Sequence, residues 1–432
     1  MKEYMRNKKA VSKMQAILIA IVIIIIAAAA VVYYYYSQTQ VRPTEKGEPI
    51  KIAVVLNLSG GYAPEGIRHR LLMTALATEI NAKGGVYLSG TGKYHPIELI
   101  FYDGESSTSR YVELATKAVT EKVAHLVIFI GAPPPFTVPA VISAEKVGGQ
   151  PVLSMSPVDT IAMNALPSIP GNKFTWTWHC SFNYTIYGML WKEWLSQWKD
   201  QIKKIGVLYS DDVSGRDAKK KVTPKLQEAG FMIVDPGLHP PGITDFTPII
   251  LKFKEEGVNV VIANTLPADW IAFRRQCAAF GFKPLMFCVG RCMKIPEAEA
   301  LGRELAEGIT AETHWWYTLP FKGNEWFKEN WQKYFGDMSL THMEGIAYTA
   351  FYVAVEAIKV AGTLDRTAIR DAFAKVDIEM PVGQVKFRPD HICETTNTLA
   401  QFVMKDGKWD MNIVYVPSWI KAPVEKPIWP LP

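Results

Sequence analysis

After residue 50, short β-branched runs alternate with longer stretches of helical periodicity, and this alternation restricts the fold more than any other feature. Strands and helices are predicted in turn at 50–56, 66–81, 97–102, 109–122, 126–130, 138–147 and 151–154. Parallel strands need crossover connections of this kind. The pattern therefore predicts an α/β fold with a parallel sheet that helices cover on both faces.

The same alternation starts again after Phe174 and predicts a second α/β lobe. Helices and strands are expected in turn at 184–199, 204–209, 218–229, 231–234, 247–256, 258–263, 268–280 and 284–288. Further helices are expected at 343–361 and 365–374, before a strand-like, proline-rich tail. Two open α/β lobes form a cleft between the carboxyl ends of their sheets, where ligands usually bind.

Residues 16–36 carry no charged side chain, and these 21 residues reach about 30 Å as a helix, enough to cross a bilayer. Residues 1–15 contain five Lys or Arg and one Glu, a net charge of +4. This asymmetry predicts a cytoplasmic basic stub at 1–15 and a transmembrane signal anchor at 16–36. The polar residues 37–49 are typical of a linker. We therefore expect a single-pass protein of the cell membrane with its main body outside.

Other interpretations of the apolar segment are weaker. A buried core helix of this length seldom lacks every polar residue. A cleaved secretory signal is usually shorter, and no small-x-small site precedes Tyr33–Tyr36. No Cys lies nearby, so a lipoprotein anchor is excluded. The stretch Lys8–Ser12 resembles the processing site of archaeal pilin-like signal peptides, which implies cleavage after Ala10 with the apolar segment retained.

Net charge and cysteine content limit the possible partners and cofactors. The whole chain carries +5, so residues 37–432 carry about +1, and no Lys/Arg stripe with interleaved aromatics predicts nucleic-acid binding. An odd count of five cysteines leaves at least one thiol unpaired or intermolecular. Cys288 and Cys292 could pair or bind metal. Because no second Cys or His pair of zinc spacing accompanies them, we expect structural residues and no metal site.

Sequence motifs of catalysis are absent. The chain has no Walker A sequence, no HExxH and no GxSxG. Gly60, Gly61 and Gly66 follow the first predicted strand, but their spacing is wrong for a dinucleotide loop and predicts a plain strand-to-helix turn. The adjacent carboxylates Asp211 and Asp212 point to different faces. We predict neither an enzyme nor a cofactor.

The segment IKIAVVLNLSGGYAPEGIRHRLLMTALATEINAKGG resembles the start of the branched-chain amino-acid class of ABC-transporter substrate-binding proteins. That class opens with a strand, a Ser/Thr-Gly loop and a helix ending in IN-x-x-GG. Further similarities occur in the same order along the chain, at Tyr102-Asp103, Thr244–Leu251, Arg275–Gly281, Tyr352–Arg370, Gly383–Phe387 and Asp406–Lys408. The similarity extends from about residue 50 to the C-terminus.

The resemblance implies a type I periplasmic-binding fold, in which two Rossmann-like lobes joined by three crossings close on a ligand. Lobe 1 would comprise 50–177 and 312–380, and lobe 2 would comprise 178–311 and 381–432. The crossings would lie near 176–182, 308–316 and 380–385. The function implied is capture of a small organic solute for an ABC permease, namely an amino-acid-like, amide or aromatic/carboxylic compound.

By position in the family, the predicted ligand-binding residues are Tyr62, Glu65, Pro135, Phe136, Ser154, Ser156, Val158, Trp178, His179, Ser214, Leu266 and Arg291. Two departures argue against an ordinary α-amino acid. Prolines replace the hydroxyls of the carboxylate-binding loop at 131–137. Arg291 stands where an acidic residue usually meets the ligand's amino group, and a cation there attracts an anion. For each of Glu65 and Arg291, a solvated loop charge is the alternative.

Aromatic residues gather at the predicted crossings, including Trp176, Trp178, Phe182, Trp270 and Trp315-Trp316. Aromatics at a cleft suit apolar or aromatic ligands. Packing between the lobes is the alternative for each of them. Two other function classes stay open. A sensory ectodomain of the same fold is disfavoured, because only about 15 residues precede the membrane to carry an output. An exported α/β enzyme is disfavoured by the missing motifs.

Overall fold

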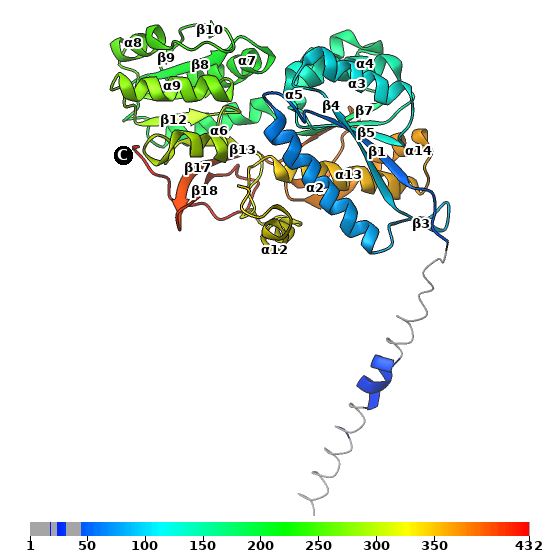
Figure 1. The fold of residues 1–432 in the computed structure, drawn as a ribbon. Coiled ribbons are helices and arrows are strands. Elements are labelled where there is room, and N and C mark those ends of the chain that lie inside the picture. Colours follow the sequence, from blue (N-terminus) through cyan, green and yellow to red (C-terminus); the bar gives the residue numbers. More distant parts are fainter. Residues whose placement is uncertain (1–17, 19–23, 32–44, 432) are drawn as a thin grey trace, which may run out of the picture.

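The computed structural model describes residues 18, 24–31 and 45–431. From residue 45 onward it contains two α/β lobes, each built on its own large sheet (Figure 1). The two-lobed α/β class predicted from the alternation is confirmed.

Lobe 1 is built on a six-stranded sheet in which all strands are parallel. In spatial order the strands are β16 (Ile392–Glu394), β7 (Thr177–Ser181), β6 (Val152–Ser154), β5 (Leu126–Phe129), β1 (Ile50–Leu56) and β4 (Ile97–Asp103). Its helices are α2 (Ala63–Ala82), α3 (Thr108–Thr120), α4 (Pro134–Val147), α5 (Val158–Ala165), α12 (Asn324–Phe335), α13 (Glu344–Ala361) and α14 (Arg366–Ala372). Helices α2 and α13 cover one face of the sheet, and α3, α4 and α5 cover the other.

Lobe 2 is built on an eight-stranded mixed sheet. In spatial order its strands are β10 (Leu238–His239), β8 (Ile205–Ser210), β11 (Val260–Asn264), β12 (Met286–Val289), β13 (Thr310–Thr313), β17 (Thr398–Lys405) and β18 (Lys408–Tyr415), with β9 (Ile233–Val234) on β8. Strand β17 is antiparallel to both of its neighbours, β13 and β18, and every other pair of neighbouring strands is parallel. The helices are α6 (Tyr184–Ser196), α7 (Val213–Glu228), α8 (Thr247–Glu255), α9 (Pro267–Ala279), α10 (Ile295–Leu301) and α11 (Arg303–Ala306).

Two small hairpins, β2 (Val86–Leu88) with β3 (Lys93–His95) and β14 (Asp377–Met380) with β15 (Gly383–Lys386), complete the strands. The chain passes between the large sheets after β7, after β13 and after β16. Strand β16 lies inside the range predicted for lobe 2 but pairs with β7 in the first sheet. The last passage therefore lies at 395–397, not at the expected 380–385, and the other lobe boundaries stay a prediction.

In each lobe, a glycine allows the helix that follows the lobe's first strand, α2 after β1 and α7 after β8, to approach that strand. A Cβ on Gly66 would lie 1.8 Å from the carbonyl oxygen of Asn57, and one on Gly215 would lie 2.1 Å from that of Ser210. No side chain fits at either distance. The close approach brings the N-termini of α2 and α7 to the carboxyl ends of their sheets, on the side where the lobes meet.

The predicted transmembrane anchor falls mostly outside the described residues. Residues 24–31 are helical and exposed. Among the residues described, no single helix is long and apolar enough to cross a membrane. One bent pair, α13 with 366–375 at 112°, meets that length and composition test.

All five cysteines are buried and free. Cys288 packs in one hydrophobic core and Cys292 in another, so their side chains serve packing in this structure. In the part of the chain that the structure describes, no group of three or more His, Cys, Asp or Glu is arranged to hold a metal ion.

The glycine contact at the start of α2 gives a stability prediction. Gly66→Ala would force the helix away from Asn57, and we expect the free energy of unfolding to fall by about 2–3 kcal/mol. Gly61→Ala, in the same loop, is the matched control, because its Cβ would meet nothing within 4 Å. Urea denaturation measures both variants. Equal stability of the two would show that α2 tolerates displacement.

Candidate ligand-binding site

A cavity of about 80 Å³ lies between the lobes. Its walls come from the loops after parallel strands of both sheets and from the segment before α13. The lining residues are Tyr62, Glu65, Ala132, Pro133, Pro134, Met155, Pro157, Phe182, Tyr184, Pro267, Arg291, Lys294, His314, His342 and Met343. Ligands of open α/β folds bind at this edge of the sheets, so the geometry marks the cavity as the candidate site.

A buried ion pair crosses the cavity from one lobe to the other. Glu65, in the first turn of α2, lies 2.8 Å from Nζ of Lys294, which precedes α10. The two side chains are only 15% and 16% exposed. Burial alone would raise the pKa of Glu65, but the nearby Lys294 outweighs it and holds that pKa below its usual value. Neither residue is a solvated loop charge in this arrangement.

Arg291 supplies a second buried cation, on the lobe 2 wall. Its Nη2 donates to Ser210 Oγ at 2.7 Å and to Asp212 Oδ2 at 2.5 Å. Burial opposes the charge, yet Asp212 keeps the pKa of Arg291 above its ordinary value. Nε and Nη1 are buried without a hydrogen-bond partner among the described residues. These two donors are free for an anionic group, and bonds of that kind are among the strongest in proteins.

Aromatic rings and neutral imidazoles form much of the remaining wall. Tyr62 meets Phe136 edge to face at 5.5 Å, and Phe182 stacks on His314 at 3.7 Å. Burial lowers the pKa of His342 to about 3 and holds that of His314 well below its usual value. Both imidazoles are therefore uncharged at neutral pH. The wall offers flat apolar faces with a few polar atoms, which suits a planar organic solute.

Asp159 makes a second polar contact between the lobes beside the cavity. This residue lies in the first turn of α5, and its carboxylate accepts hydrogen bonds from the backbone N–H groups of Tyr184 and Thr185, at 3.2 and 3.1 Å. Lys221 on α7 lies 2.9 Å from the same carboxylate. The N-terminus of α6 favours a negative charge. In the closed arrangement, the Asp159 carboxylate is therefore paired with two elements of lobe 2, the start of α6 and Lys221 of α7.

Behind the lobe 2 wall, Glu312 at β13 accepts a hydrogen bond from Trp191 Nε1 at 2.9 Å. Its side chain is buried. Burial raises the pKa of Glu312 to about 8, so the carboxyl is mostly protonated at pH 7. The region around Arg291 therefore gains no negative charge from it.

The predicted site residues divide into three groups. Tyr62, Glu65 and Arg291 line the cavity. Pro135, Phe136, Ser154, Ser156, Val158 and Leu266 adjoin lining residues without belonging to the lining. Trp178, His179 and Ser214 lie outside the lining.

The residues outside the lining are held by contacts within a lobe. Trp178 stacks on His391 at 3.6 Å, and His179 packs on Phe174 at 4.2 Å. Ser156 Oγ lies 2.5 Å from Thr137 Oγ1. Trp178 and His179 are both buried in lobe 1, and of the aromatics expected at the crossings, only Phe182 reaches the cavity.

Sequence reasoning missed Lys294, His314 and His342. Each stands in a loop outside the matched motifs, and none has a spacing that marks a site. His314 follows a strand that the alternation did not predict, β13. For Lys294 and His314 the one available signal was position after a strand of lobe 2, where loops meet the cleft; His342, between α12 and α13, had no such signal.

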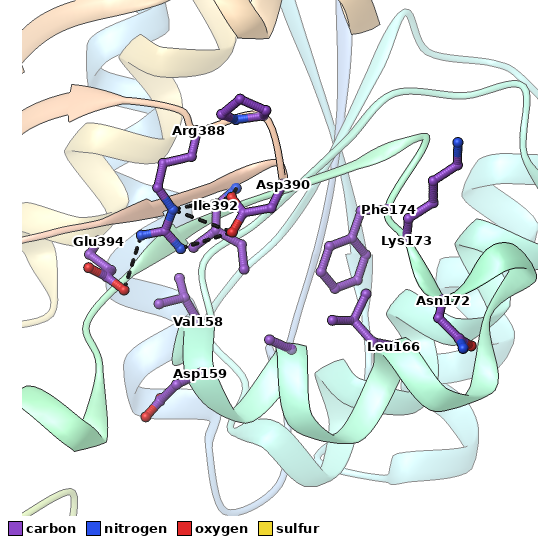
Figure 2. Close-up of a pocket in the computed structure, with 12 residues that line it drawn as sticks. Val158, Asp159, Leu166, Asn172, Lys173, Phe174, Arg388, Asp390, Ile392 and Glu394 are labelled. Atoms are coloured by element: carbon purple, nitrogen blue, oxygen red, sulfur yellow. Dashed lines mark hydrogen bonds and ion pairs between the residues drawn. The ribbon is translucent and has the colours of Figure 1, made fainter.

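A larger pocket of about 340 Å³ lies on lobe 1 beside β16 (Figure 2). Its walls include the apolar side chains of Val158, Leu166 and Phe174. Figure 2 shows Arg388 held by carboxylates, with Asp390 at 3.1 Å and Glu394 at 3.2 Å. The lining of this larger pocket comes from the segments around α5 and β16, whereas both lobes line the smaller cavity, so we favour the smaller cavity.

The comparisons with known proteins agree with this geometry. The sequence model of the family described as periplasmic binding protein matches residues 49–408. A Leu/Ile/Val-binding protein homologue of Brucella abortus is 25% identical over 339 residues, which cover 76% of this chain and 82% of the homologue.

Solved structures share the fold. A leucine-binding protein of Thermotoga maritima aligns with TM-score 0.71 at 18% identity, covering 85% of this chain and 99% of that protein. A solute-binding protein of an ABC transporter from Rhodopseudomonas palustris, in complex with 3,4-dihydroxybenzoic acid, aligns with TM-score 0.71 at 20% identity, covering 87% and 99%. The expected type I periplasmic-binding fold is confirmed.

The ion pair across the cavity predicts a charge-reversal experiment. Glu65→Lys would place two cations together, costing the closed form about 3 kcal/mol, or roughly a 100-fold shift toward open lobes. The radius of gyration from X-ray scattering should increase. Glu65→Lys combined with Lys294→Glu should restore it.

Glu113→Lys is the matched control, since it changes the charge of an exposed ion pair to Arg110 within α3. An unchanged radius of gyration in Glu65→Lys would mean that this pair does not hold the lobes together.

Glu312 predicts a pH dependence of stability. The unfolded carboxyl ionises above about pH 4.5, whereas the folded one keeps its proton to about pH 8. The folded state therefore binds more protons in this window, and the free energy of unfolding falls as pH rises through it. Relative to Glu312→Gln, the wild type should lose up to about 5 kcal/mol between pH 4.5 and 8.

Chemical denaturation at a series of pH values measures this difference. Glu255→Gln is the control at an exposed carboxyl. Parallel pH profiles of wild type and Glu312→Gln would contradict a raised pKa in the folded state.

Proposed function

Because the chain belongs to the periplasmic binding protein family, we propose that it is the extracytoplasmic solute-binding protein of an ABC importer. The two lobes capture a small organic solute in the cavity between them, and closure brings Glu65 to Lys294 and Asp159 to Lys221. The closed form then docks on the permease subunits. In this proposal no bond in the solute is made or broken.

We propose a small organic acid as the solute. The observation that carries this is Arg291, whose buried Nε and Nη1, beside the cavity, have no hydrogen-bond partner in the described part of the chain. A carboxylate there would accept two charge-assisted hydrogen bonds. The rings of Tyr62, Phe182 and Tyr184 favour an aromatic or planar body. The bound 3,4-dihydroxybenzoic acid and 4-hydroxybenzoate of the Rhodopseudomonas palustris proteins support the aromatic alternative.

Amino acids are the competing class. One solved relative, from Streptococcus pneumoniae, is a substrate-binding protein of a branched-chain amino acid transporter in complex with isoleucine. An α-ammonium group would need an acidic or carbonyl partner, but Asp212 and Glu65 are already paired with Arg291 and Lys294. The charges around the cavity therefore favour an acid without an ammonium group.

For the membrane, we propose that residues 16–36 tether the binding domain to the outer side of the cell membrane. The support is the uncharged 21-residue run after a +4 stub. Membrane fractionation with an extracellular protease tests it. If the binding domain is protected from the protease, or is released into the soluble fraction, a single-pass anchor with the domain outside is contradicted.

The ligand proposal is tested by thermal shift against amino acids, amides, urea and aromatic acids. A carboxylic acid should raise Tm, because ligand binding to the folded state stabilises it. Arg291→Gln should weaken binding of that acid by about 10- to 100-fold and binding of its amide analogue by less than about threefold.

Arg303→Gln, at an arginine whose side chain is 70% exposed, is the matched control. If Arg291→Gln weakens binding of the acid and of the amide equally, the solute's carboxylate does not contact Arg291. Turnover of the solute, followed by NMR, would overturn the binding-protein proposal itself.

A further inference from the structure

Two cysteines 213 positions apart stand opposite each other at the edge of lobe 1. Cys180 in β7 and Cys393 in β16 are register partners in neighbouring parallel strands. Such strands lie about 4.8 Å apart, and residues in register point to the same face. That separation lies within the Cα–Cα range of disulfides, about 4.4–6.8 Å. Both thiols are buried in the same hydrophobic core.

The local chemistry distinguishes this pair from the other three cysteines. The interaction between the two thiols lowers the pKa of Cys393 against the effect of burial, and the same interaction, with burial, raises the pKa of Cys180. Burial raises the pKa of both Cys277 and Cys292 to about 12. Thiolates are the reactive form in thiol–disulfide exchange, so Cys393 is the more reactive thiol.

We propose that Cys180 and Cys393 form an intramolecular disulfide in the exported protein. The location outside the cytoplasm is part of the proposed function, and an oxidising compartment is where such bonds persist. The oxidant is a small-molecule or protein disulfide.

The exchange takes place in two steps. The Cys393 thiolate attacks one sulfur of the oxidant's disulfide. The S–S bond breaks, the other sulfur leaves as a thiol, and the attacked sulfur stays bound to Cys393 as a mixed disulfide. Cys180 then attacks that bond and releases the second thiol. Two protein thiols are oxidised, one external disulfide is reduced to two thiols, and the two protein protons pass to those thiols.

The disulfide would link the ends of two passages between the lobes. Beyond Cys180 the chain leaves β7 for α6, and beyond Cys393 it leaves β16 for β17. The bond therefore joins two connections about which the lobes move, and it closes a loop of more than 200 residues. A loop of that length should raise Tm by roughly 5 °C on oxidation.

The test uses the full chain, refolded from denaturant in oxidised or in reduced glutathione, so that both thiols meet the oxidant before the core excludes it. After oxidation, thiol titration in denaturant should find three thiols in place of five. A non-reducing peptide map should join the peptides that contain Cys180 and Cys393, and Tm should rise. The double variant Cys180→Ser/Cys393→Ser should keep its three thiols under both conditions. Cys288→Ala/Cys292→Ala should still lose two.

Five free thiols in oxidised, folded wild-type protein, or a bond between other cysteines, would overturn the proposal. The wild-type peptide map is sufficient even where a variant fails to fold. The outcome is separable from the solute-binding proposal. If the protein forms no disulfide but still shows a ligand-induced thermal shift, only the disulfide proposal fails. If the disulfide forms but no solute shifts Tm, only the ligand proposal fails.

Discussion

Buried charge limits how the two lobes can meet. A carboxylate and an ammonium group inside a protein are tolerated only when each has a partner, because desolvation costs several kcal/mol per ion. Glu65 and Lys294 come from different lobes and satisfy each other only across the closed cavity. Arg291 and Asp212, by contrast, are paired within lobe 2 and stay so in any arrangement of the lobes. The Glu65–Lys294 pair therefore depends on closure. The Arg291–Asp212 pair holds the Arg291 side chain on the lobe 2 wall of the cavity before a ligand binds.

This division assigns different tasks to the two cations. Lys294 is paired with Glu65 when the lobes are closed, whereas Arg291 keeps two donors that no described residue accepts from. The neutral His314 and His342 and the protonated Glu312 add no charge around them. The cavity is then nearly balanced in charge, with one directional site for an anion and flat rings beside it.

The alternation of strands and helices was enough to predict the two lobes. The predicted strand 50–56 and the structure's β1 coincide, because a β-branched run that ends at a turn has clear limits. Helix α5 was not predicted, since Pro157 and the hydroxyl-rich residues before it are typical of a loop. Strand β16 is only three residues long, too short to carry a periodic pattern, and its pairing with β7 is a long-range event. The positions of Tyr62, Glu65 and Arg291 followed from the resemblance to the family, whereas Trp178 and His179 lie inside strand β7 and are buried within lobe 1.

The most direct test of the account is a crystal structure of the protein with the organic acid that gives the largest thermal shift. The account predicts the acid between the lobes, with its carboxylate oxygens within about 3 Å of Arg291 Nε or Nη1, its body against Tyr62 and Phe182, and the Glu65–Lys294 pair formed. An acid bound in the pocket beside Arg388, or a carboxylate turned away from Arg291, would contradict it.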